Sequence, residues 1–210
     1  MDCQVDDEKV LKKNSKSFHW AGKFLPKECI NRAAKLYSFC RILDDIADSG
    51  EINSLKDLVR TDCPNKNLVL EKVNPPEIEL NKFFYKNIGK NHRWIDRLAW
   101  DNIKWMRYLE NEKINTYILK KSQDLVGYFE VIKDEPIKSS EIAYFGILED
   151  YIGKKFGGYM LSEAIKLCFE NNSKRAWVHT CTLDHENALK NYIKRGMKIF
   201  KEETIHLNIG

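Results

Sequence analysis

The sequence GKKFGG at residues 153–158 has the features of a phosphate-binding loop. It lies between a strand-like run and the start of a helical pattern, where unpaired backbone N–H groups and the helix dipole attract anions. Its glycines allow a ligand to approach the backbone closely, and Lys154 and Lys155 add positive charge. The loop predicts a pyrophosphate site, although a turn with solvated lysines is an equally simple interpretation.

A second group of candidate residues lies in NALKNYIKRGMKIF, residues 187–200. Asn187 opens a predicted helix that contains Tyr192 and ends at Gly196, before a final strand. A tyrosine with an ordinary pKa of about 10 is a suitable acid for a departing thiolate, whose conjugate thiol titrates around 8.5. The alternative role of Tyr192 is that of a core aromatic residue.

The elements that must position these residues alternate between strand and helix patterns after about residue 68. Prolines 75 and 76 begin one predicted helix, and a short helix surrounds Trp105. Three strands joined by polar turns predict an antiparallel meander, in which Gly146 indicates a bulge. A strand–helix–strand unit follows and predicts a parallel pairing. The predicted strands are residues 67–73, 114–120, 124–132, 141–148 and 175–180, and the second unit's helix carries Met160, Leu161, Ala164, Ile165 and Cys168 on one face.

Residues 1–60 have a different, helical pattern throughout. Apolar and acidic residues recur every three or four positions up to Asp48, before Ser49 and Gly50 end the run. The stretch RTDCPNKN, residues 60–67, marks the predicted boundary. We therefore expect a helical segment at 1–60 and a second domain at 61–210. The fold class is α+β, with a mixed β-sheet flanked by helices and preceded by a short all-α segment.

The composition excludes several other classes of protein. The formal charge of +4 is spread over a 210-residue chain, which argues against a nucleic-acid partner. Because no apolar run could span a bilayer and the first residues are acidic, we expect a soluble, cytoplasmic protein. The cysteines lack the spacing of zinc sites or disulfide frameworks, so reduced thiols are expected at positions 3, 29, 40, 63, 168 and 181.

The order of strand, glycine-rich loop, helix, strand and Asn/Tyr helix resembles the GNAT superfamily of acyltransferases. The resemblance covers about residues 68–210 and is closest along EIAYFGILEDYIGKKFGGYMLSEAIK and AWVHTCTLDHENALKNYIKRGMKIF. It implies a mixed sheet that is splayed at the bulged strand. It also implies an N-acetyltransferase that moves an acetyl group from the co-substrate acetyl-CoA to an amine by direct attack in a ternary complex, without a metal.

The same resemblance implies roles for individual residues. The main chain around Phe145 and Ile147 would pair with the pantetheine arm, Asn187 would contact the pantetheine amide, and Tyr192 would lie beside the sulfur. The pyrophosphate would be held by the loop residues Gly153, Lys154, Phe156, Gly157 and Gly158.

Two positions depart from the family pattern of Arg or Gln, two residues, Gly, any residue, Gly or Ala. They are Ile152, where the pattern has a polar residue, and Lys155, where it has glycine. A left-handed conformation at Lys155 would cost on the order of 1 kcal/mol.

Several groups in the sequence could deprotonate the acceptor amine. An amine with a pKa near 10 must lose a proton before it attacks. Glu141 resembles the acidic position that often serves as base, while Glu130, His179, Asp184 and a water chain stay open. Cys181 suggests a covalent route, but a strand-end cysteine is usually a packed residue. The acceptor side, or equally the core, would include Trp94, Trp100, Trp105 and Tyr144.

Residues 15–50 resemble the opening of a squalene or phytoene synthase, through the words SKSF, LP, LYSFCR and DDIAD. In that family the acidic motif, here Asp44, Asp45 and Asp48, binds magnesium that bridges a prenyl diphosphate. The second aspartate-rich motif is missing, which predicts a truncated synthase start. Two alternative functions remain: a prenyl-diphosphate-binding fragment that is inactive alone, and a non-catalytic acyl-CoA-binding module. A homodimer is compatible with the sequence, which does not specify the oligomeric state.

Overall fold

The computed structural model describes residues 46–92, 94–181 and 184–204. The chain divides into two compact units, one of residues 47–202 and the other of residues 1–46 with 203–210. The described structure is therefore almost entirely that of the larger unit. The predicted all-α segment, as far as residue 45, lies outside the described residues.

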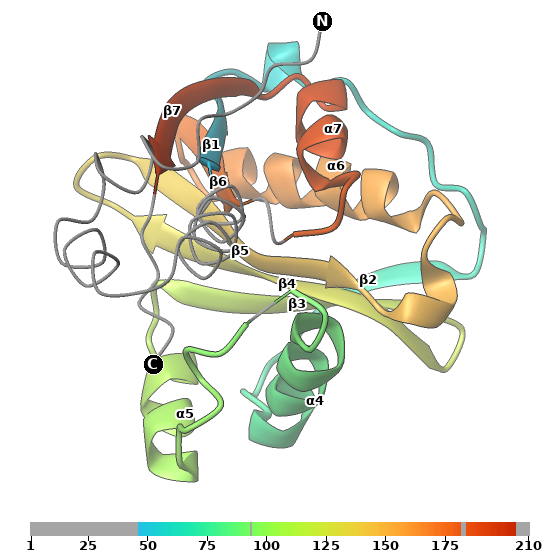
Figure 1. Ribbon diagram of the computed structural model, residues 1–210, viewed down its shortest axis with the longest axis vertical. Coiled ribbons are helices and arrows are strands. Elements are labelled where there is room, and N and C mark those ends of the chain that lie inside the picture. The colour runs from blue at the N-terminus through green and yellow to red at the C-terminus, as the bar shows by residue number, and fades with distance from the viewer. Residues whose placement is uncertain (1–45, 93, 182–183, 205–210) are drawn as a thin grey trace, which may run out of the picture. The chain divides into compact units, whose positions relative to one another are not determined.

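Seven described strands form one mixed sheet in the order β2-β3-β4-β5-β6-β1-β7 (Figure 1). β2 to β5 pair antiparallel with their sequence neighbours, whereas β5 and β6 pair in parallel. The predicted meander, parallel pairing and mixed sheet are thus confirmed. The strands are β1 (Ile46–Ile52), β2 (Leu68–Lys72), β3 (Ile114–Lys121), β4 (Asp124–Asp134), β5 (Ser139–Ile147), β6 (Arg175–Thr180) and β7 (Lys198–Thr204).

β1 departs from the predicted helical pattern. It lies between β6 and β7 and pairs antiparallel with β6. Ser49 and Gly50, which were expected to end a helix, are buried within this strand, and Ile52 joins the core. The helix prediction is wrong for residues 46–52. So short a run fits both the spacing of an α-helix and the alternation of a β-strand, and pairing with β6 decides between them. The domain boundary at residues 60–67 stays a prediction, and the sheet takes in residues on both sides of it.

Helices cover both faces of the sheet (Figure 1). α4 (Ile78–Gly89) and α5 (Asn102–Leu109) lie on one face, whereas α6 (Phe156–Glu170) and α7 (Ala188–Lys194) lie on the other. The Asp101 carboxylate caps α5 by accepting a hydrogen bond from the Lys104 N–H at 2.7 Å. Short 3-10 turns, η1 (Leu55–Asp57) and η2 (Glu149–Tyr151), occur in the connections. Within the described residues, no helix has both the length and the apolar character needed to cross a membrane.

The main core lies between the sheet and α6. The predicted apolar face of α6 is fully buried there against side chains of β4, β5 and β6. Burial of each large aliphatic side chain in such a layer contributes about 1.5–3 kcal/mol. A second, largely aromatic layer lies under α4 and α5 and includes Phe84, Tyr85, Trp105 and Tyr128.

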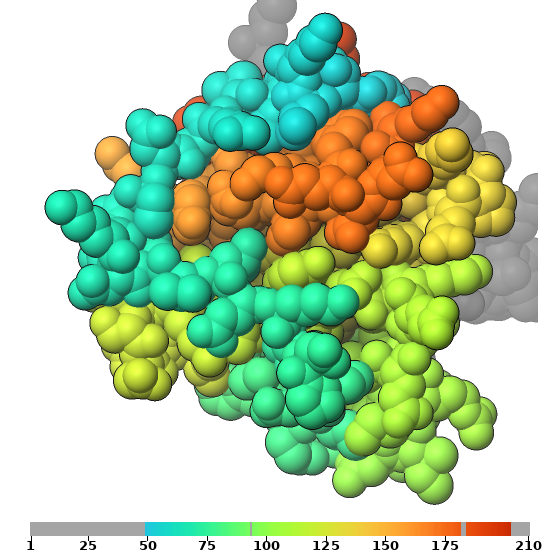
Figure 2. Space-filling model, turned by 180° about the vertical axis from the view of Figure 1, so that it is seen from behind, coloured from blue at the N-terminus to red at the C-terminus, as the bar shows by residue number. Residues whose placement is uncertain are grey.

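The segment between β1 and β2 runs along α6 on the opposite view (Figure 2). The Val59 N–H donates to the Arg195 carbonyl at 3.1 Å, and the Thr61 N–H donates to Ser162 Oγ at 3.0 Å. Gly196 has a φ of +93°, and an added Cβ there would collide with the Asp57 carbonyl. The connection is therefore held against both α6 and the end of α7.

Candidate active site

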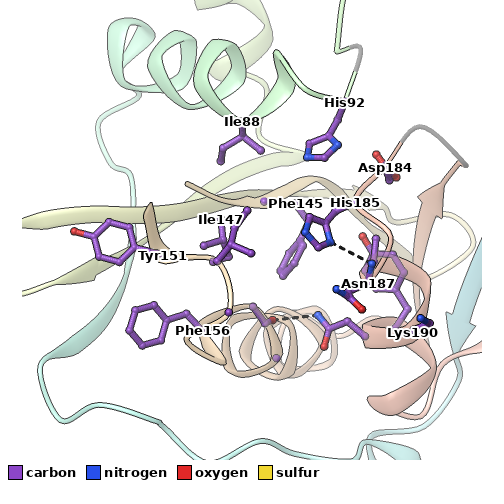
Figure 3. A pocket seen from close by; sticks show the side chains of 18 of the residues that line it. Ile88, His92, Phe145, Ile147, Tyr151, Phe156, Asp184, His185, Asn187 and Lys190 are labelled. Carbon is purple, nitrogen blue, oxygen red and sulfur yellow. Dashed lines mark hydrogen bonds between the residues drawn. The ribbon is translucent and has the colours of Figure 1, made fainter. Parts of the chain in front are cut away.

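A cavity of about 540 Å³ opens where β5 and β6 separate (Figure 3). Their pairing ends at Ile142 opposite Val178, so residues 143–147 have no partner in β6. Strand backbone that faces such a gap can hydrogen-bond an extended ligand, as in strand addition. The remaining walls come from the first turn of α6, from α7 and the residues before it, and from the end of α4.

Most of the predicted site residues meet in this cavity. Lys154 and Glu141 do not line it. Lys154 instead donates to the Asp150 carbonyl at 2.7 Å, and its ammonium lies 4.9 Å from the centre of the Tyr151 ring. The predicted residues that do line the cavity are Phe145, Ile147, Gly153, Phe156, Gly157, Gly158, Asn187 and Tyr192.

The wall formed by β5 contains a bulge. The register shifts between Tyr128 and Glu130 of β4, and Tyr144 has a positive φ of +48°. The irregularity therefore centres on Tyr144 and Phe145 rather than on Gly146, where the sequence predicted it. Gly146 has another role, because an added Cβ would collide with Ile88 of α4.

The first turn of α6 supplies the predicted anion site. Phe156, Gly157 and Gly158 begin the helix and line the cavity, so N–H groups without intrahelical partners lie at its wall. Lys155 immediately precedes them with φ +64° and ψ 8°, a left-handed conformation. The loop thus keeps a glycine-like shape at the position where the sequence has lysine.

Tyr192 of α7 lies deep in the cavity wall. Its side chain is 5% exposed, and its ring centre lies 6.4 Å from that of Phe145. Burial raises the pKa of the Tyr192 phenol well above its ordinary value, and the charges of Asp184 and Cys181 raise it further. The phenol is therefore a proton donor, and not a base, at neutral pH. Asn191 ties α7 to α6 by donating to the Gly157 carbonyl at 3.4 Å.

Glu141, the predicted base, lies on β5 outside the cavity. Burial raises the pKa of its carboxyl group, and the charge of Glu130 adds to the rise, while Arg97 opposes it. Glu141 lies four positions before Phe145 on β5, which is about 13 Å along a strand. A proton could pass from the cavity to Glu141 only through intervening groups.

Two other base candidates have structural partners. Glu130 is fully buried, and its carboxylate accepts hydrogen bonds from Arg97 at 2.8 and 3.1 Å and from the Tyr108 hydroxyl at 2.5 Å. His179 lies 3.3 Å from the Ser49 hydroxyl and does not line the cavity. Neither group is placed to take a proton from a ligand in the cavity.

Asp184, the remaining candidate, does line the cavity, together with two histidines that sequence reasoning missed. His92 follows α4 and His185 precedes α7, and their ring centres are 6.3 Å apart. The His185 ring accepts a hydrogen bond from the Asn187 N–H at 3.1 Å. The only available sequence signal was the position of His185 two residues before Asn187.

The predicted acceptor-side aromatics gather around Arg97. The Arg97 guanidinium carbon lies 3.9 Å from the ring centre of Tyr144 and 5.0 and 5.4 Å from those of Trp100 and Trp105. Trp94 packs edge-on against Tyr144 at 5.3 Å. Of these aromatics, Trp94 alone also lines the cavity, whereas Trp105 is a core residue that is 2% exposed.

The charged groups on the cavity wall are mostly basic. Lys155, Lys190 and Lys194 line it, and none of them forms an ion pair with another described residue. Asp184 is the one carboxylate among the described lining residues. Such a surface favours an anionic ligand.

The cysteines and the acidic motif add little to this site. Of the described cysteines, Cys63, Cys168 and Cys181, none lines the cavity, and the other three lie outside the described residues. Asp44 and Asp45 also lie outside the described residues, and residue 48 belongs to β1. Magnesium binding by the acidic motif stays a hypothesis.

Known families match the chain in two successive parts. The squalene/phytoene synthase pattern matches residues 11–66, and the acetyltransferase (GNAT) family pattern matches residues 78–197. The bifunctional lycopene cyclase/phytoene synthase of Phaffia rhodozyma is 44% identical over 46 residues, which are 22% of this chain and 7% of that protein.

Solved structures share the fold at low sequence identity. A GCN5-related N-acetyltransferase from Kribbella flavida has a TM-score of 0.53 and 14% identity over 73% of this chain and 54% of its own. One from Sphaerobacter thermophilus has a TM-score of 0.57 and 12% identity, with 75% and 49% covered. This chain thus spans about half the length of those two proteins.

An aminoglycoside acetyltransferase from an uncultured soil metagenomic sample has a TM-score of 0.56 and 12% identity, with 70% of this chain and 97% of its own covered. These neighbours establish the fold, and the family pattern covers more than half of the 210 residues. Behind a start that matches squalene/phytoene synthases, the chain therefore belongs to the acetyltransferase (GNAT) family.

Proposed function

We propose that this protein is an acyl-CoA-dependent N-acyltransferase that moves an acetyl group from acetyl-CoA to an amine by direct attack in a ternary complex. The cavity at the separation of β5 and β6 carries the proposal. It combines unpaired strand backbone, a helix N-terminus and three lysines, which together suit a long, polyphosphorylated ligand.

Each part of acetyl-CoA would contact its own section of the cavity wall. The backbone of Phe145 and Ile147 would pair with the amides of the pantetheine arm, and Asn187 would bind one of them through its side chain. The first turn of α6 would hold the pyrophosphate, with Lys155 supplying charge there. Because Lys154 is turned toward Asp150, Lys190 and Lys194 are the better candidates for further phosphate contacts.

Tyr192 would supply the acid for the leaving group. Acetyl-CoA brings an acetyl group activated as a thioester, and the amine nitrogen bonds to its carbonyl carbon while the carbon–sulfur bond breaks. The nitrogen releases a proton to solvent as the amide forms. The Tyr192 hydroxyl donates its proton to the departing sulfur and is reprotonated from solvent, so the products are the amide and the free thiol of CoA. Its raised pKa keeps the phenol protonated beyond pH 10, so no loss of activity below pH 10 should arise from Tyr192.

The first test is a calorimetric titration of the full chain with acetyl-CoA, followed by an assay of CoA release with amines. We expect micromolar binding by both the wild type and Tyr192→Phe, and a fall in kcat of about 100-fold in the variant. Absence of binding would overturn the proposal. Tight binding with no turnover of any amine would instead identify an acyl-CoA-binding module.

A further inference from the structure

We infer that the acceptor is an amine with a single ammonium group on an apolar or aromatic body, which Asp184 binds through the ammonium and Trp94 and Ile88 contact through the body. The inference rests on the proposed function, since it assigns the acceptor end of the same cavity. Figure 3 shows Ile88, His92 and Asp184 together at one end of the pocket, away from Tyr151 and Phe156.

Asp184 lines the same cavity as Tyr192, the proposed acid at the reaction centre. Its charge contributes to the raised pKa of the Tyr192 phenol. The Thr180 hydroxyl and the Cys181 N–H hold the carboxylate at 2.7 and 3.2 Å, and both hydrogen bonds end on Oδ2. A carboxylate has about four lone-pair sites, so Asp184 can still accept a hydrogen bond from the ammonium group. The bound ammonium then loses a proton to water before its nitrogen attacks the thioester.

The neighbouring wall is apolar and rigid. Trp94 is packed against Tyr85, Tyr128 and Tyr144 at ring-centre distances of 5.7, 6.2 and 5.3 Å, yet part of it reaches the cavity. Ile88 reaches the same cavity from the last turn of α4. Such a surface gains most by covering an apolar body, and the side chains of Ile88 and Trp94 offer no hydrogen-bond acceptor to a second ammonium or to several hydroxyls.

The charges in the cavity also select against polycations. Three lysines and one carboxylate line it, and the phosphates of CoA would neutralise the lysines. Asp184 is then the one anionic partner that the described wall offers. A polyamine or an aminoglycoside would bring further ammonium groups, for which the described wall has no second carboxylate, and this lowers its affinity.

The test compares three acceptors with the full chain at saturating acetyl-CoA: 2-phenylethylamine, spermidine and kanamycin. Product masses identify N-acetylation, and kcat/KM ranks the amines. We expect 2-phenylethylamine to exceed both polycations by about 10-fold or more. Trp94→Ala should remove most of this preference, whereas Trp94→Phe should retain it.

Asp184→Asn tests the ammonium contact, because the amide keeps the shape of the carboxylate but not its charge. We expect the KM for 2-phenylethylamine to rise about 10-fold or more while the KM for acetyl-CoA changes by less than about twofold. Asp134→Asn, at an exposed carboxylate outside the cavity, is the matched control and should change neither. Thermal melting verifies that each variant is folded.

The outcomes separate this inference from the proposed function. Equal or faster acetylation of spermidine or kanamycin, or an unchanged amine KM in Asp184→Asn, would overturn the acceptor class while leaving the acetyltransferase intact. Binding of acetyl-CoA without acetylation of 2-phenylethylamine would also overturn it. Failure to bind acetyl-CoA at all would overturn both.

Discussion

Lys155 combines a charged side chain with a left-handed backbone conformation, which is usually found at glycine. It carries positive charge into the cavity, and it holds the left-handed conformation that lets α6 begin at Phe156. For a residue with a Cβ this conformation costs roughly 1–2 kcal/mol, which glycine would avoid. Lysine at this position therefore lowers the conformational stability of the loop but supplies a positive charge near the expected pyrophosphate.

Replacing Lys155 should separate these two effects. We expect Lys155→Gly to be more stable than Lys155→Ala by about 1 kcal/mol, because both lack the charge and only alanine keeps a Cβ. Urea unfolding gives the two free energies. Both variants should bind acetyl-CoA several-fold more weakly than the wild type, with roughly equal Kd values. Equal stability of the two variants would mean that the loop relaxes when the lysine is removed.

Glu130, one of the candidate bases, has a structural role as the buried partner of Arg97. Glu130→Gln leaves the Arg97 guanidinium, itself 4% exposed, without its counter-charge, so we expect a loss of about 3–5 kcal/mol in the free energy of unfolding. The control is Glu71→Gln at the exposed Glu71–Lys120 pair, which should cost at most about 1 kcal/mol. Similar small losses in the two variants would show that the buried pair adds little.

Sequence reasoning identified more of the residues on the proposed cofactor side of the cavity than on its proposed acceptor side. The glycines lie within residues 153–158, and Asn187 and Tyr192 lie within one short segment, so local pattern and resemblance were enough to single them out. The proposed acceptor end includes His92, Trp94 and Asp184, which line the cavity from the residues after α4 and from the β6–α7 connection. The sequence shows that Glu141 begins a strand, which led to its prediction as the base. It does not show how far Glu141 lies from the cavity.

At the scale of elements, the contact of α4 with β5 shapes the cavity wall. Ile88 lies directly over Gly146, where a side chain would collide with it, and both residues line the cavity. The sequence indicated a bulge at Gly146, because a glycine within a strand is typical either of a bulge or of close approach by another element, and the sequence does not distinguish the two. In the structure the reason is the close approach of Ile88 in α4.

Gly146→Ala should push α4 away from the sheet. We expect a loss of about 1–3 kcal/mol in the free energy of unfolding and weaker acetyl-CoA binding, because Ile88 must move. Gly157→Ala is the control for stability alone, since its Cβ would lie 3.7 Å from Ile147, an ordinary contact distance. In the double variant with Ile88→Ala, removal of the opposing side chain should recover part of the lost stability. A loss unchanged by Ile88→Ala would exclude the proposed collision.

At the scale of the whole molecule, β1 joins the two parts of the sequence. The synthase-like match extends to residue 66, yet residues 46–52 form a strand between β6 and β7. The meander was predictable because its strands are neighbours in the chain and polar turns separate them. β1 was not, because its partner β6 lies some 130 residues later, as the Ser49–His179 contact illustrates.

The position of β1 predicts where the chain can be shortened. A chain that begins at residue 61 loses the strand between β6 and β7, the core side chain of Ile52 and the hydrogen bond from Val59 to Arg195. Unpaired backbone groups on both neighbouring strands would then face the gap. We therefore expect residues 61–210 to unfold without cooperativity and not to bind acetyl-CoA. Residues 46–210 should unfold cooperatively and bind acetyl-CoA as the full chain does. Circular dichroism during urea unfolding and calorimetry measure the two properties.

A synthetic peptide of residues 46–60 provides the matched test, because it supplies β1 and the contact with Arg195 as a separate chain. If strand pairing is what the short chain lacks, the peptide should restore cooperative unfolding and binding, and a peptide with Gly50→Pro, which cannot donate a backbone hydrogen bond at that buried position, should not. A chain of residues 61–210 that unfolds with the same denaturant dependence as residues 46–210 would contradict the essential role of β1. The functional boundary of the acetyltransferase would then lie at the predicted residues 60–67 after all, with β1 as an addition to a complete sheet.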